Sequence, residues 1–439
     1  MGSYLPSTPR EQQEMLEAIG LGHLRDLYTP DVPASVLLED SVNIPSGLPE
    51  MSVRARMEKM ASKNTVFGTV LRGAGSYNHH IPAIVNTVTS REEFLTTYTP
   101  YQPEISQGVL QSIFEYQTMM AELTGLDVSN ASVYDGASAA AEAVMMTQTR
   151  SRSRVYVAST AHPDVIRTIK TYCWGRDVPF CEIPQNDGLL DLDALRDLPK
   201  DTACVYVQQP NFYGLFEQTE SIAELTHEAG AKAVMGFYPI SLGICKSPGE
   251  MGYDIAVGEG QPLGLPMSWG GPYLGIMTAR KELMRMLPGR IVGETKDSKG
   301  RRAYVLTLQA REQHIRREKA SSNICTNQAL CAMTAAVYLA AIGPDGLAEV
   351  AQLCYEGAHY FSEELGKLKG FERVHKAEFF NEFMTHCPMD VRLFEQEMAR
   401  RSILCGLAVD DKLLWCVTEK VDKQEIDDVI AIIKEVCGQ

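Results

Sequence analysis

The sequence has 439 residues, of which 45% are hydrophobic and 22% are charged. This composition is typical of a soluble globular protein, and the length favours one large and one smaller domain over a single simple core. The formal net charge of −15 at pH 7 argues against nucleic acid or an anionic membrane as a partner, because both would repel the chain.

The cysteines indicate a reducing compartment. There are eleven, an odd number without CxxC spacing, and several lie within apolar runs, among them Cys204, Cys245, Cys405 and Cys416. Such thiols are typically buried and reduced, so we expect a cytoplasmic chain without a zinc site. We also expect no membrane span, because no run of about 18 apolar residues stands out. Residues 1–6 show no signal-peptide pattern.

Residues 1–70 are predicted to form an arm. Apolar residues at helical spacing predict a short helix over residues 8–20, ending at Gly20, and a second helix over 52–63. The stretch between them is punctuated by prolines, namely Pro30, Pro33, Pro45 and Pro49. An extended arm of this kind either wraps a partner subunit or straps the chain's own surface, and composition does not distinguish the two.

A glycine-framed loop carries two adjacent histidines, His79 and His80, beside Asn78. Neighbouring side chains on an extended backbone point to opposite sides, and no third ligand lies nearby in the sequence. Metal binding is therefore disfavoured. The expected role is that of a hydrogen-bonding loop at a subunit interface.

The segment Tyr98-Thr-Pro-Tyr-Gln-Pro-Glu-Ile-Ser-Gln-Gly108 is predicted to be a stiff loop that positions a ligand. Pro100 and Pro103 restrict their own backbone and that of the residue before them. The polar side chains that this loop displays are Tyr98, Tyr101, Gln102 and Glu104. The alternative is a surface loop whose tyrosines merely pack on their neighbours.

After this loop, short apolar strands alternate with helices. Strands are expected over residues 155–159, 203–207, 231–236, 254–258 and 273–277, and helices over 107–124, 139–146, 163–172, 221–229, 328–342 and 347–368. Such alternation favours a mostly parallel sheet covered on both faces. We predict an α/β large domain over residues 71–325 and a smaller α/β domain over 326–439.

This order of elements favours the aspartate-aminotransferase type (fold type I) of pyridoxal-phosphate fold. Its chemistry needs a lysine for the Schiff base, an aspartate beside the pyridine nitrogen, and a helix N-terminus for the phosphate. Gly136 and Ser138, at the start of the helix of residues 139–146, are candidates for a phosphate cradle. Glycine and serine are common near helix starts, so this signal alone is weak.

The other two requirements are not met. The strand that ends near Gly236 carries no carboxylate, and the loop of residues 259–272 contains no lysine. Lys246 and Lys281 flank that loop and are expected to be exposed surface lysines. Without the amine, the chain cannot form the covalent bond that holds the cofactor.

Residues 301–319 are rich in basic side chains, with Arg311 and Arg316 among them. One interpretation is a solvated helix with i,i+4 pairs such as Glu312–Arg316. The other is that these arginines bind a carboxylate, a phosphate or an acidic partner.

Several of these motifs together resemble the glycine decarboxylase family, the P-protein of the glycine cleavage system. They occur in the family's order and span nearly the whole chain: Gly73-Ala-Gly-Ser-Tyr-Asn78, Tyr98–Gly108, Thr124-Gly-Leu-Asp-Val-Ser-Asn-Ala-Ser132, Gly258-Glu-Gly-Gln-Pro-Leu-Gly-Leu-Pro266, Leu287-Pro-Gly-Arg290 and Arg311-Glu-Gln-His-Ile-Arg-Arg317. The chain is similar to the α subunit of the split form. The absent lysine and aspartate are what that resemblance implies.

The resemblance implies the following chemistry and partners. A β subunit of the same fold carries the lysine and pyridoxal phosphate, and this chain binds no cofactor. The two subunits, as an α2β2 heterotetramer, decarboxylate glycine and transfer its aminomethyl group to the lipoyl arm (lipoate) of the H-protein. The α subunit alone is expected to be inactive.

The expected site lies at the α–β interface. The loop residues Tyr98, Tyr101, Gln102 and Glu104 would line a cleft and orient the substrate or the cofactor phosphate, and Asn78 and His79 would border it. Possible contacts with substrate or partner are Arg311, Arg316 and Asn323. The alternatives are a self-sufficient pyridoxal-phosphate enzyme, which needs some other lysine, and a non-catalytic scaffold or regulatory subunit, which has no need of the polar loop.

Overall fold

The computed structural model describes residues 7–38, 42–320 and 322–439. Its contacts divide the chain into two compact units, Met1–Thr65 and Val66–Gln439. Residues 1–6, where we looked for a signal peptide, lie outside the described residues.

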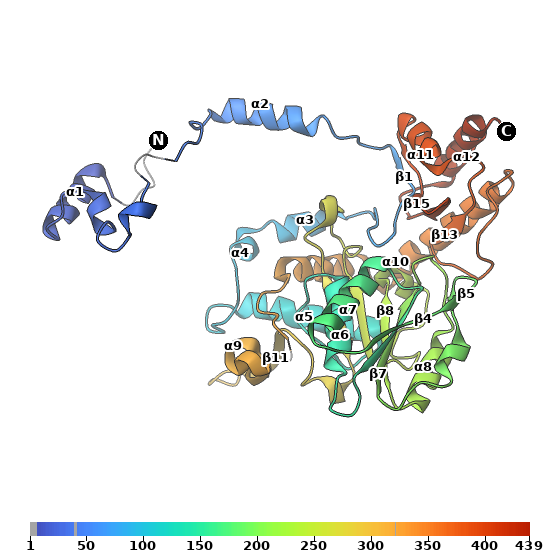
Figure 1. Cartoon of the computed structure of the whole chain (residues 1–439), viewed down its shortest axis with the longest axis horizontal. Helices are drawn as coiled ribbons and strands as arrows, with labels where there is room; N and C mark the ends of the chain where they lie inside the picture. The colour runs from blue at the N-terminus through green and yellow to red at the C-terminus, as the bar shows by residue number, and fades with distance from the viewer. Residues whose placement is uncertain (1–6, 39–41, 321) are drawn as a thin grey trace. The chain divides into compact units, whose positions relative to one another are not determined.

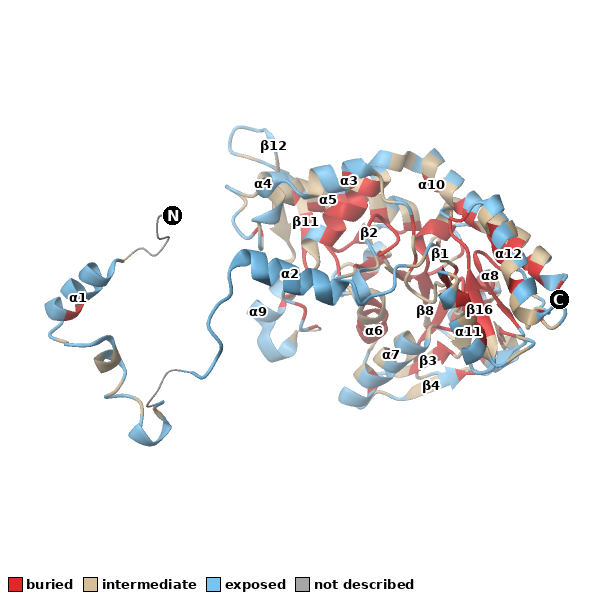
Figure 2. Ribbon diagram, turned by 90° about the horizontal axis from the view of Figure 1, so that it is seen from above, coloured by how far each residue is buried: buried red, intermediate tan, exposed pale blue. Residues whose placement is uncertain are grey.

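The first unit consists of short helices joined by irregular backbone (Figure 1). Its elements are α1 (Pro9–Ala18), η1 (Leu24–Leu27), η2 (Ala34–Val36) and α2 (Glu50–Ala61). The two predicted helices are thus present. α1 starts with a capping box between Thr8 and Glu11. α2 buries none of its residues, as the pale-blue ribbon in Figure 2 shows.

A seven-stranded sheet lies at the centre of the second unit (Figure 1). Its strands follow the order β2-β10-β9-β8-β7-β3-β4; β10 runs antiparallel to β2 and β9, and the other neighbouring strands are parallel. They are β2 (Val128–Ser129), β3 (Arg154–Ala158), β4 (Phe180–Ile183), β7 (Thr202–Gln209), β8 (Lys232–Phe237), β9 (Ile255–Glu259) and β10 (Gly275–Ala279). The predicted mostly parallel sheet is confirmed. The sequence analysis missed β2 and β4.

Alternate residues of the central strands face two separate cores. On β7, Val205 and Val207 pack into one core, whereas Cys204 and Tyr206 pack into the other. The first core also takes residues from α5 (Gln107–Thr124), α8 (Thr219–Glu228) and α10 (Ala329–Gly366), and the second from α6 (Gly136–Met146) and α7 (Pro163–Gly175). Helices therefore cover both faces of the sheet, as expected.

Two local signals set the helices that position the site. α5 ends at Gly125, whose φ of +64° is the left-handed conformation that glycine adopts at a helix end. α6 begins at Asp135, whose side chain accepts the Ser138 N–H at 2.7 Å. Its following alanines are fully buried, so α6 can lie close against β9 and β10.

α10 is interrupted at Gly343-Pro344, between the helices predicted over residues 328–342 and 347–368. Gly343 is non-helical, with a φ of +64°, and divides α10 into two helical segments. By length and composition α10 could also cross a membrane. The prediction that the chain has no apolar run of this length was therefore wrong. α10 is instead a core helix, with Ala332, Ala335 and Tyr338 buried.

The C-terminal residues build a smaller α/β layer around the buried Trp415. Its elements are β13 (Glu382–Thr385), α11 (Val391–Arg400), β14 (Ile403–Leu404), β15 (Leu407–Val409), β16 (Lys412–Cys416) and α12 (Lys423–Cys437). β1 (Thr69–Val70) pairs in parallel with β14, so residues 66–70 belong with the second unit and not with the arm. A domain boundary near residue 325 stays a prediction.

Residues 301–319 do not form one solvated helix. Their first part is β12 (Arg302–Thr307), which pairs with β11 (Ile291–Lys296) as a hairpin. Three short helical turns follow, η7 (Gln309–Arg311), α9 (Gln313–Arg316) and η8 (Arg317–Lys319). Glu312 is buried, and its nearest described basic partner is His314, at 3.6 Å, instead of Arg316.

Candidate functional site

A cavity of about 500 Å³ opens at the carboxyl ends of the parallel strands. Gln208 from β7, Gly236 from β8 and Glu259 from β9 contribute to it, together with Gly136 and Ser138 from the start of α6. Ligands of open α/β sheets bind at this edge. The cavity thus lies where the fold would hold pyridoxal phosphate.

The start of α6, predicted as a phosphate cradle, already holds an anionic group of the chain itself. Glu259 Oε2 accepts the Gly136 N–H at 2.9 Å. Its Oε1 accepts the N–H groups of Gln261 and Leu274, both at 3.0 Å. Burial raises the pKa of Glu259 to about 7, against the lowering effect of these three hydrogen bonds.

The end of the strand at which a pyridine-binding carboxylate would be expected has no space for one. At Gly236 an added Cβ would collide with the Tyr206 hydroxyl, so no longer side chain fits there without moving that ring. None of the described residues that line the cavity is a lysine or an arginine. Lys246 and Lys281 are exposed, as expected, and Lys246 pairs with Glu220 at 2.7 Å.

A second buried carboxylate lines the same cavity. Glu382 accepts the Ala74 N–H at 2.6 Å and the Tyr77 hydroxyl at 2.8 Å. Burial raises the pKa of Glu382 to about 7. With Glu259, Asp135 and Asp164, the lining holds four acidic side chains and no described basic side chain except His162. The residues present therefore do not fit pyridoxal phosphate, whose phosphate is an anion and whose aldehyde needs an amine.

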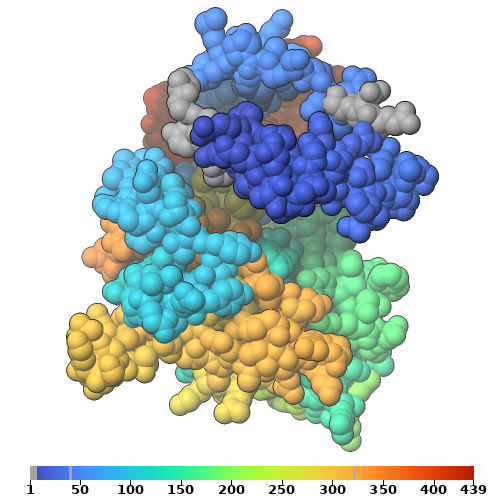
Figure 3. All heavy atoms as spheres, turned by 90° about the vertical axis from the view of Figure 1, so that its left-hand side faces the viewer, coloured from blue at the N-terminus to red at the C-terminus, as the bar shows by residue number. Residues whose placement is uncertain are grey.

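The loop of residues 98–106 lies outside this cavity lining, against the segment of residues 291–326. Figure 3 shows the cyan part of the chain beside the gold part. Gln107, at the start of α5, anchors the loop, because its amide both donates to and accepts from the Tyr304 backbone at 2.9 Å. The Tyr98 hydroxyl lies 3.2 Å from Thr326 Oγ1.

Tyr101 lies over a buried arginine that sequence reasoning did not single out. Arg290 is 4% exposed, and its Nη2 donates to the Tyr101 hydroxyl at 2.9 Å. Its Nη1 donates to Asn327 Oδ1 at 3.3 Å, and its Cζ lies 5.1 Å from the centre of the Tyr101 ring. The only sequence signal was the run Leu287-Pro-Gly-Arg290, in which the glycine turn precedes the arginine.

The donors of the two arginines here are not all satisfied. Arg290 Nε has no hydrogen-bond partner within the described part of the chain, and neither do Nε and Nη2 of Arg311. Arg311 Nη1 donates to the Leu287 carbonyl. Burial lowers the pKa of Arg311, against the effect of Glu312. Buried guanidinium donors without acceptors are rare, which points to an acceptor from outside the chain.

The remaining predicted residues of this region are exposed. Gln102, Glu104, Arg316 and Asn323 all lie at the surface. The structure brings Tyr101 beside His314, with ring centres 6.5 Å apart. It thus gathers the loop and the arginine segment on one face.

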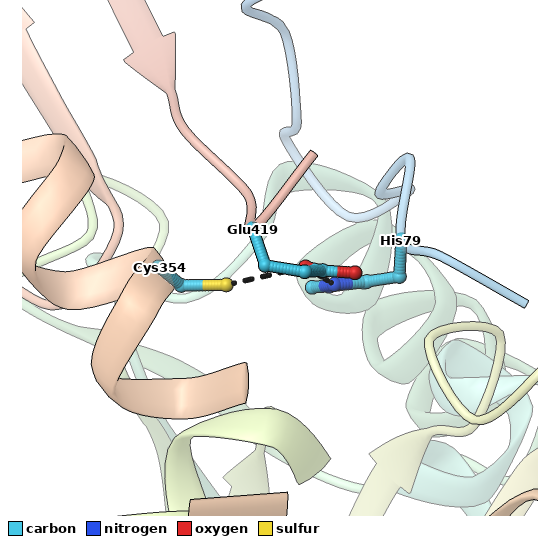
Figure 4. Close-up of side chains that lie close together, drawn as sticks. All are labelled: His79, Cys354 and Glu419. Atoms are coloured by element: carbon cyan, nitrogen blue, oxygen red, sulfur yellow. Dashed lines mark hydrogen bonds and ion pairs between the residues drawn. The ribbon is translucent and has the colours of Figure 1, made fainter. Parts of the chain in front are cut away.

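His79 occupies a different, internal cluster (Figure 4). It is 6% exposed, its Nδ1 lies 2.6 Å from Glu419 Oε2, and its Nε2 contacts the Tyr238 hydroxyl. Cys354 donates to the same Glu419 oxygen at 3.5 Å. A third potential metal ligand therefore does lie near His79, although it is remote in sequence.

The cluster is nevertheless better described as a hydrogen-bond network. Both ring nitrogens of His79 have partners. Burial and the Glu419 carboxylate raise the pKa of the Cys354 thiol well above its ordinary value, which disfavours the thiolate that a metal needs. Asn78 is half-buried and accepts from Thr418 and Lys420. His79 thus has no ring atom to offer a partner chain.

Comparisons with known proteins show which family this chain is similar to. The sequence model of the family described as Glycine cleavage system P-protein matches residues 2–433. A relative from Desulfitobacterium hafniense, "Probable glycine dehydrogenase (decarboxylating) subunit 1", is 45% identical, over 99% of this chain and 100% of its own length. A relative of the same name from Carboxydothermus hydrogenoformans is 48% identical, over 98% and 99%.

Solved structures agree. The crystal structure of a glycine decarboxylase (P-protein) of the glycine cleavage system, in inhibitor-bound form, superposes with a TM-score of 0.94 at 41% identity and covers 99% of this chain and 100% of that one. Glutamate decarboxylase from Lactobacillus brevis, at 11% identity and a TM-score of 0.68 over 95% of this chain and 97% of that one, shows the fold alone. The predicted fold type and the resemblance to the P-protein are confirmed.

Proposed function

This chain belongs to the glycine cleavage system P-protein family, as subunit 1 of a split glycine dehydrogenase (decarboxylating), and we propose that it completes an active site whose cofactor is held by subunit 2. The numbering of the subunits implies that such a partner exists. The partner would supply the lysine and the pyridoxal phosphate, and this chain would bind no cofactor.

The lining of the cavity supports the cofactor-free role. Pyridoxal phosphate requires an amine, a carboxylate near its ring nitrogen and an anion seat. The described lining of the cavity has no lysine. A side chain at Gly236 would collide with the Tyr206 hydroxyl, and the Glu259 carboxylate occupies the N–H group of Gly136 to which an anion would bind. Without subunit 2, this chain would therefore be inactive.

The observation that carries the proposal is the pairing of exposed Tyr101 with buried Arg290. A tyrosine that is 50% exposed holds one edge of a guanidinium whose Nε lacks an acceptor, and Arg311 beside the same loop lacks two. These donors suit an anionic group that arrives with the partner. The two candidates are the carboxylate of glycine and the phosphate of the cofactor.

The work of this chain in the reaction would then be positioning. Pyridoxal phosphate, when bound to the partner, supplies the electron sink for decarboxylation. Tyr98 and Tyr101 would close the cleft over glycine, and Arg290 and Arg311 would orient the anion. Exposed Gln102, Glu104 and Asn323 would provide further polar contacts.

The aminomethyl group would pass to the lipoyl arm (lipoate) of the H-protein. Arg316 is exposed and, with Arg317 and Lys319, forms a basic surface beside the loop. Such a surface would attract an acidic region of the H-protein and speed docking.

Assembly with subunit 2 as an α2β2 heterotetramer would cover the exposed arm. α2 carries Val53, Met57 and Met60 at i, i+4 and i+7 spacing, and these side chains are 44%, 56% and 54% exposed. An apolar face of this size on a helix without buried residues is typical of a subunit contact. The eleven reduced cysteines of this chain fit a cytoplasmic location.

The test is to purify the chain, incubate it with pyridoxal phosphate, desalt it and record the absorbance spectrum, alone and with subunit 2. We expect no retained cofactor on this chain alone and glycine decarboxylation only after mixing. A borohydride-trappable cofactor on this chain alone would instead indicate a self-sufficient enzyme. Full activity of subunit 2 without this chain would indicate a scaffold or regulatory subunit.

A further inference from the structure

The N-terminus of α6 has the geometry of an anion seat. α6 spans eleven residues, and its first turn presents backbone N–H groups and the positive end of the helix dipole toward the cavity. Asp135 already accepts the Ser138 N–H. The Gly136 N–H is left for a second acceptor, and that acceptor is Glu259.

Glu259 is held in the seat from three sides. The Gly136 amide comes from α6, the Gln261 amide from the turn after β9, and the Leu274 amide from the approach to β10. The backbone is packed as tightly as the side chain, because an added Cβ at Gly136 would lie 2.9 Å from the Glu259 nitrogen. The three N–H groups therefore hold the carboxylate at the start of α6.

We propose that Glu259 is a built-in anion that occupies the phosphate seat of this cavity and so excludes phosphate esters from the chain. A phosphate at the same amides would displace three hydrogen bonds and would face the carboxylate at close range. It would also face Glu382 and Asp164 across a lining with no described lysine or arginine. The inference concerns this chain's own cavity and does not rest on the proposed function.

The seat is latent under this proposal and should reappear when the carboxylate is removed. Glu259→Ser removes the whole carboxylate, and Glu259→Gln removes only its charge. Glu259→Asp keeps the charge on a shorter side chain. Glu382→Gln is the matched control, because it removes a carboxylate of the same cavity that does not contact α6.

The experiment measures the binding of inorganic phosphate and of pyridoxal phosphate to the full chain at pH 8 by calorimetry, at constant ionic strength. We expect no measurable binding to the wild type, to Glu259→Asp or to Glu382→Gln. Glu259→Ser should bind both probes at least tenfold more tightly than the wild type, and its thermal midpoint should rise with phosphate.

Two results would overturn the proposal. One is phosphate binding to the wild type with an affinity equal to that of Glu259→Ser. The other is the absence of any gain in both Glu259→Ser and Glu259→Gln. If Glu259→Ser does not fold, the isosteric Glu259→Gln decides alone, by a gain or by none. A gain of equal size in Glu382→Gln would assign the exclusion to the summed charge of the cavity and would refute the specific role of Glu259.

Discussion

Arg290 Nη2 donates a hydrogen bond to the Tyr101 hydroxyl at 2.9 Å, while the Arg290 guanidinium carbon lies 5.1 Å from the centre of the Tyr101 ring. The hydrogen bond fixes the edge of the guanidinium, and the contact with the ring fixes its face. A partly exposed loop residue thus determines the orientation of a buried cation. This coupling explains why a stiff loop is useful at the site, since movement of Tyr101 would release Arg290.

Tyr101→Phe should lower glycine decarboxylation by the assembled enzyme about tenfold, because a hydrogen bond to a charged group contributes roughly 1.5–3 kcal/mol. The ring contact is kept, so the complex should remain assembled. The measurement is the rate of release of CO2 from glycine after mixing with subunit 2, with size-exclusion chromatography as the check on assembly. Tyr360→Phe removes the hydroxyl that contacts Asp427, far along the chain, and should leave the rate unchanged. An unaltered rate in Tyr101→Phe would remove the role given to its hydroxyl.

Arg290→Lys distinguishes the two anions proposed for the site. Lysine keeps the charge but cannot reach Tyr101 and Asn327 together, because it lacks the planar guanidinium. If the anion is the glycine carboxylate, KM for glycine should rise by about tenfold with cofactor retention unchanged. If it is the cofactor phosphate, the assembled enzyme should instead lose pyridoxal phosphate on desalting. Wild-type values for both would show that Arg290 serves only the packing of the loop.

Glu382 should make stability depend on pH. Its pKa rises from 4.5 to about 7 on folding, because the carboxyl group is buried. The folded state therefore favours the protonated form, and this stabilisation is complete below pH 4.5 and is lost as the pH rises through 7. The difference corresponds to ~3 kcal/mol. Glu382→Gln mimics the neutral form, so its stability relative to the wild type should rise between pH 5 and pH 8 in urea unfolding. The exposed Glu356→Gln should show no such trend, and parallel pH curves for wild type and Glu382→Gln would contradict the assignment.

The exposed apolar face of α2 should matter for assembly and not for folding. Met57 is 56% exposed, and α2 buries no residue, so Met57→Glu should leave the unfolding transition of this chain unchanged. Its association with subunit 2 should weaken by at least tenfold in analytical ultracentrifugation, because a charge would be placed in an apolar contact. Lys59→Glu introduces an acidic side chain on the opposite side of the same helix and is the matched comparison. Equal affinities for wild type and Met57→Glu would exclude this face from the interface.

The sequence predicted those features that depend on neighbours in the chain. The strand over residues 203–207, the helix over 107–124 and the break between residues 342 and 347 each follow from residues within a few positions. The absence of a lysine in residues 259–272 likewise needed no structure. Features that join distant segments were not predictable in this way.

Three such features changed the account of the site. Glu259 reaches the start of α6 across 123 positions, and nothing local to either segment marks that contact. Arg290 and Tyr101 are 189 positions apart. The hairpin of β11 and β12 was not predicted, because its charged residues fit a helical pattern equally well. Pairing between the two strands selects the strand conformation over the helix.

The network around His79 should behave as a structural tie and not as a metal site. His79 and Glu419 are 340 positions apart and join the loop of residues 73–82 to the C-terminal layer. His79→Gln removes part of a buried charged hydrogen bond, so it should lower stability by roughly 1.5–3 kcal/mol. His80→Gln, at the exposed neighbouring position, should have little effect. The measurement is the thermal midpoint with and without Zn²⁺ at micromolar concentration. Zn²⁺ should leave the midpoint of the wild type unchanged, because the Cys354 thiol resists ionisation. A rise with Zn²⁺ that disappears in His79→Gln would establish a metal site instead.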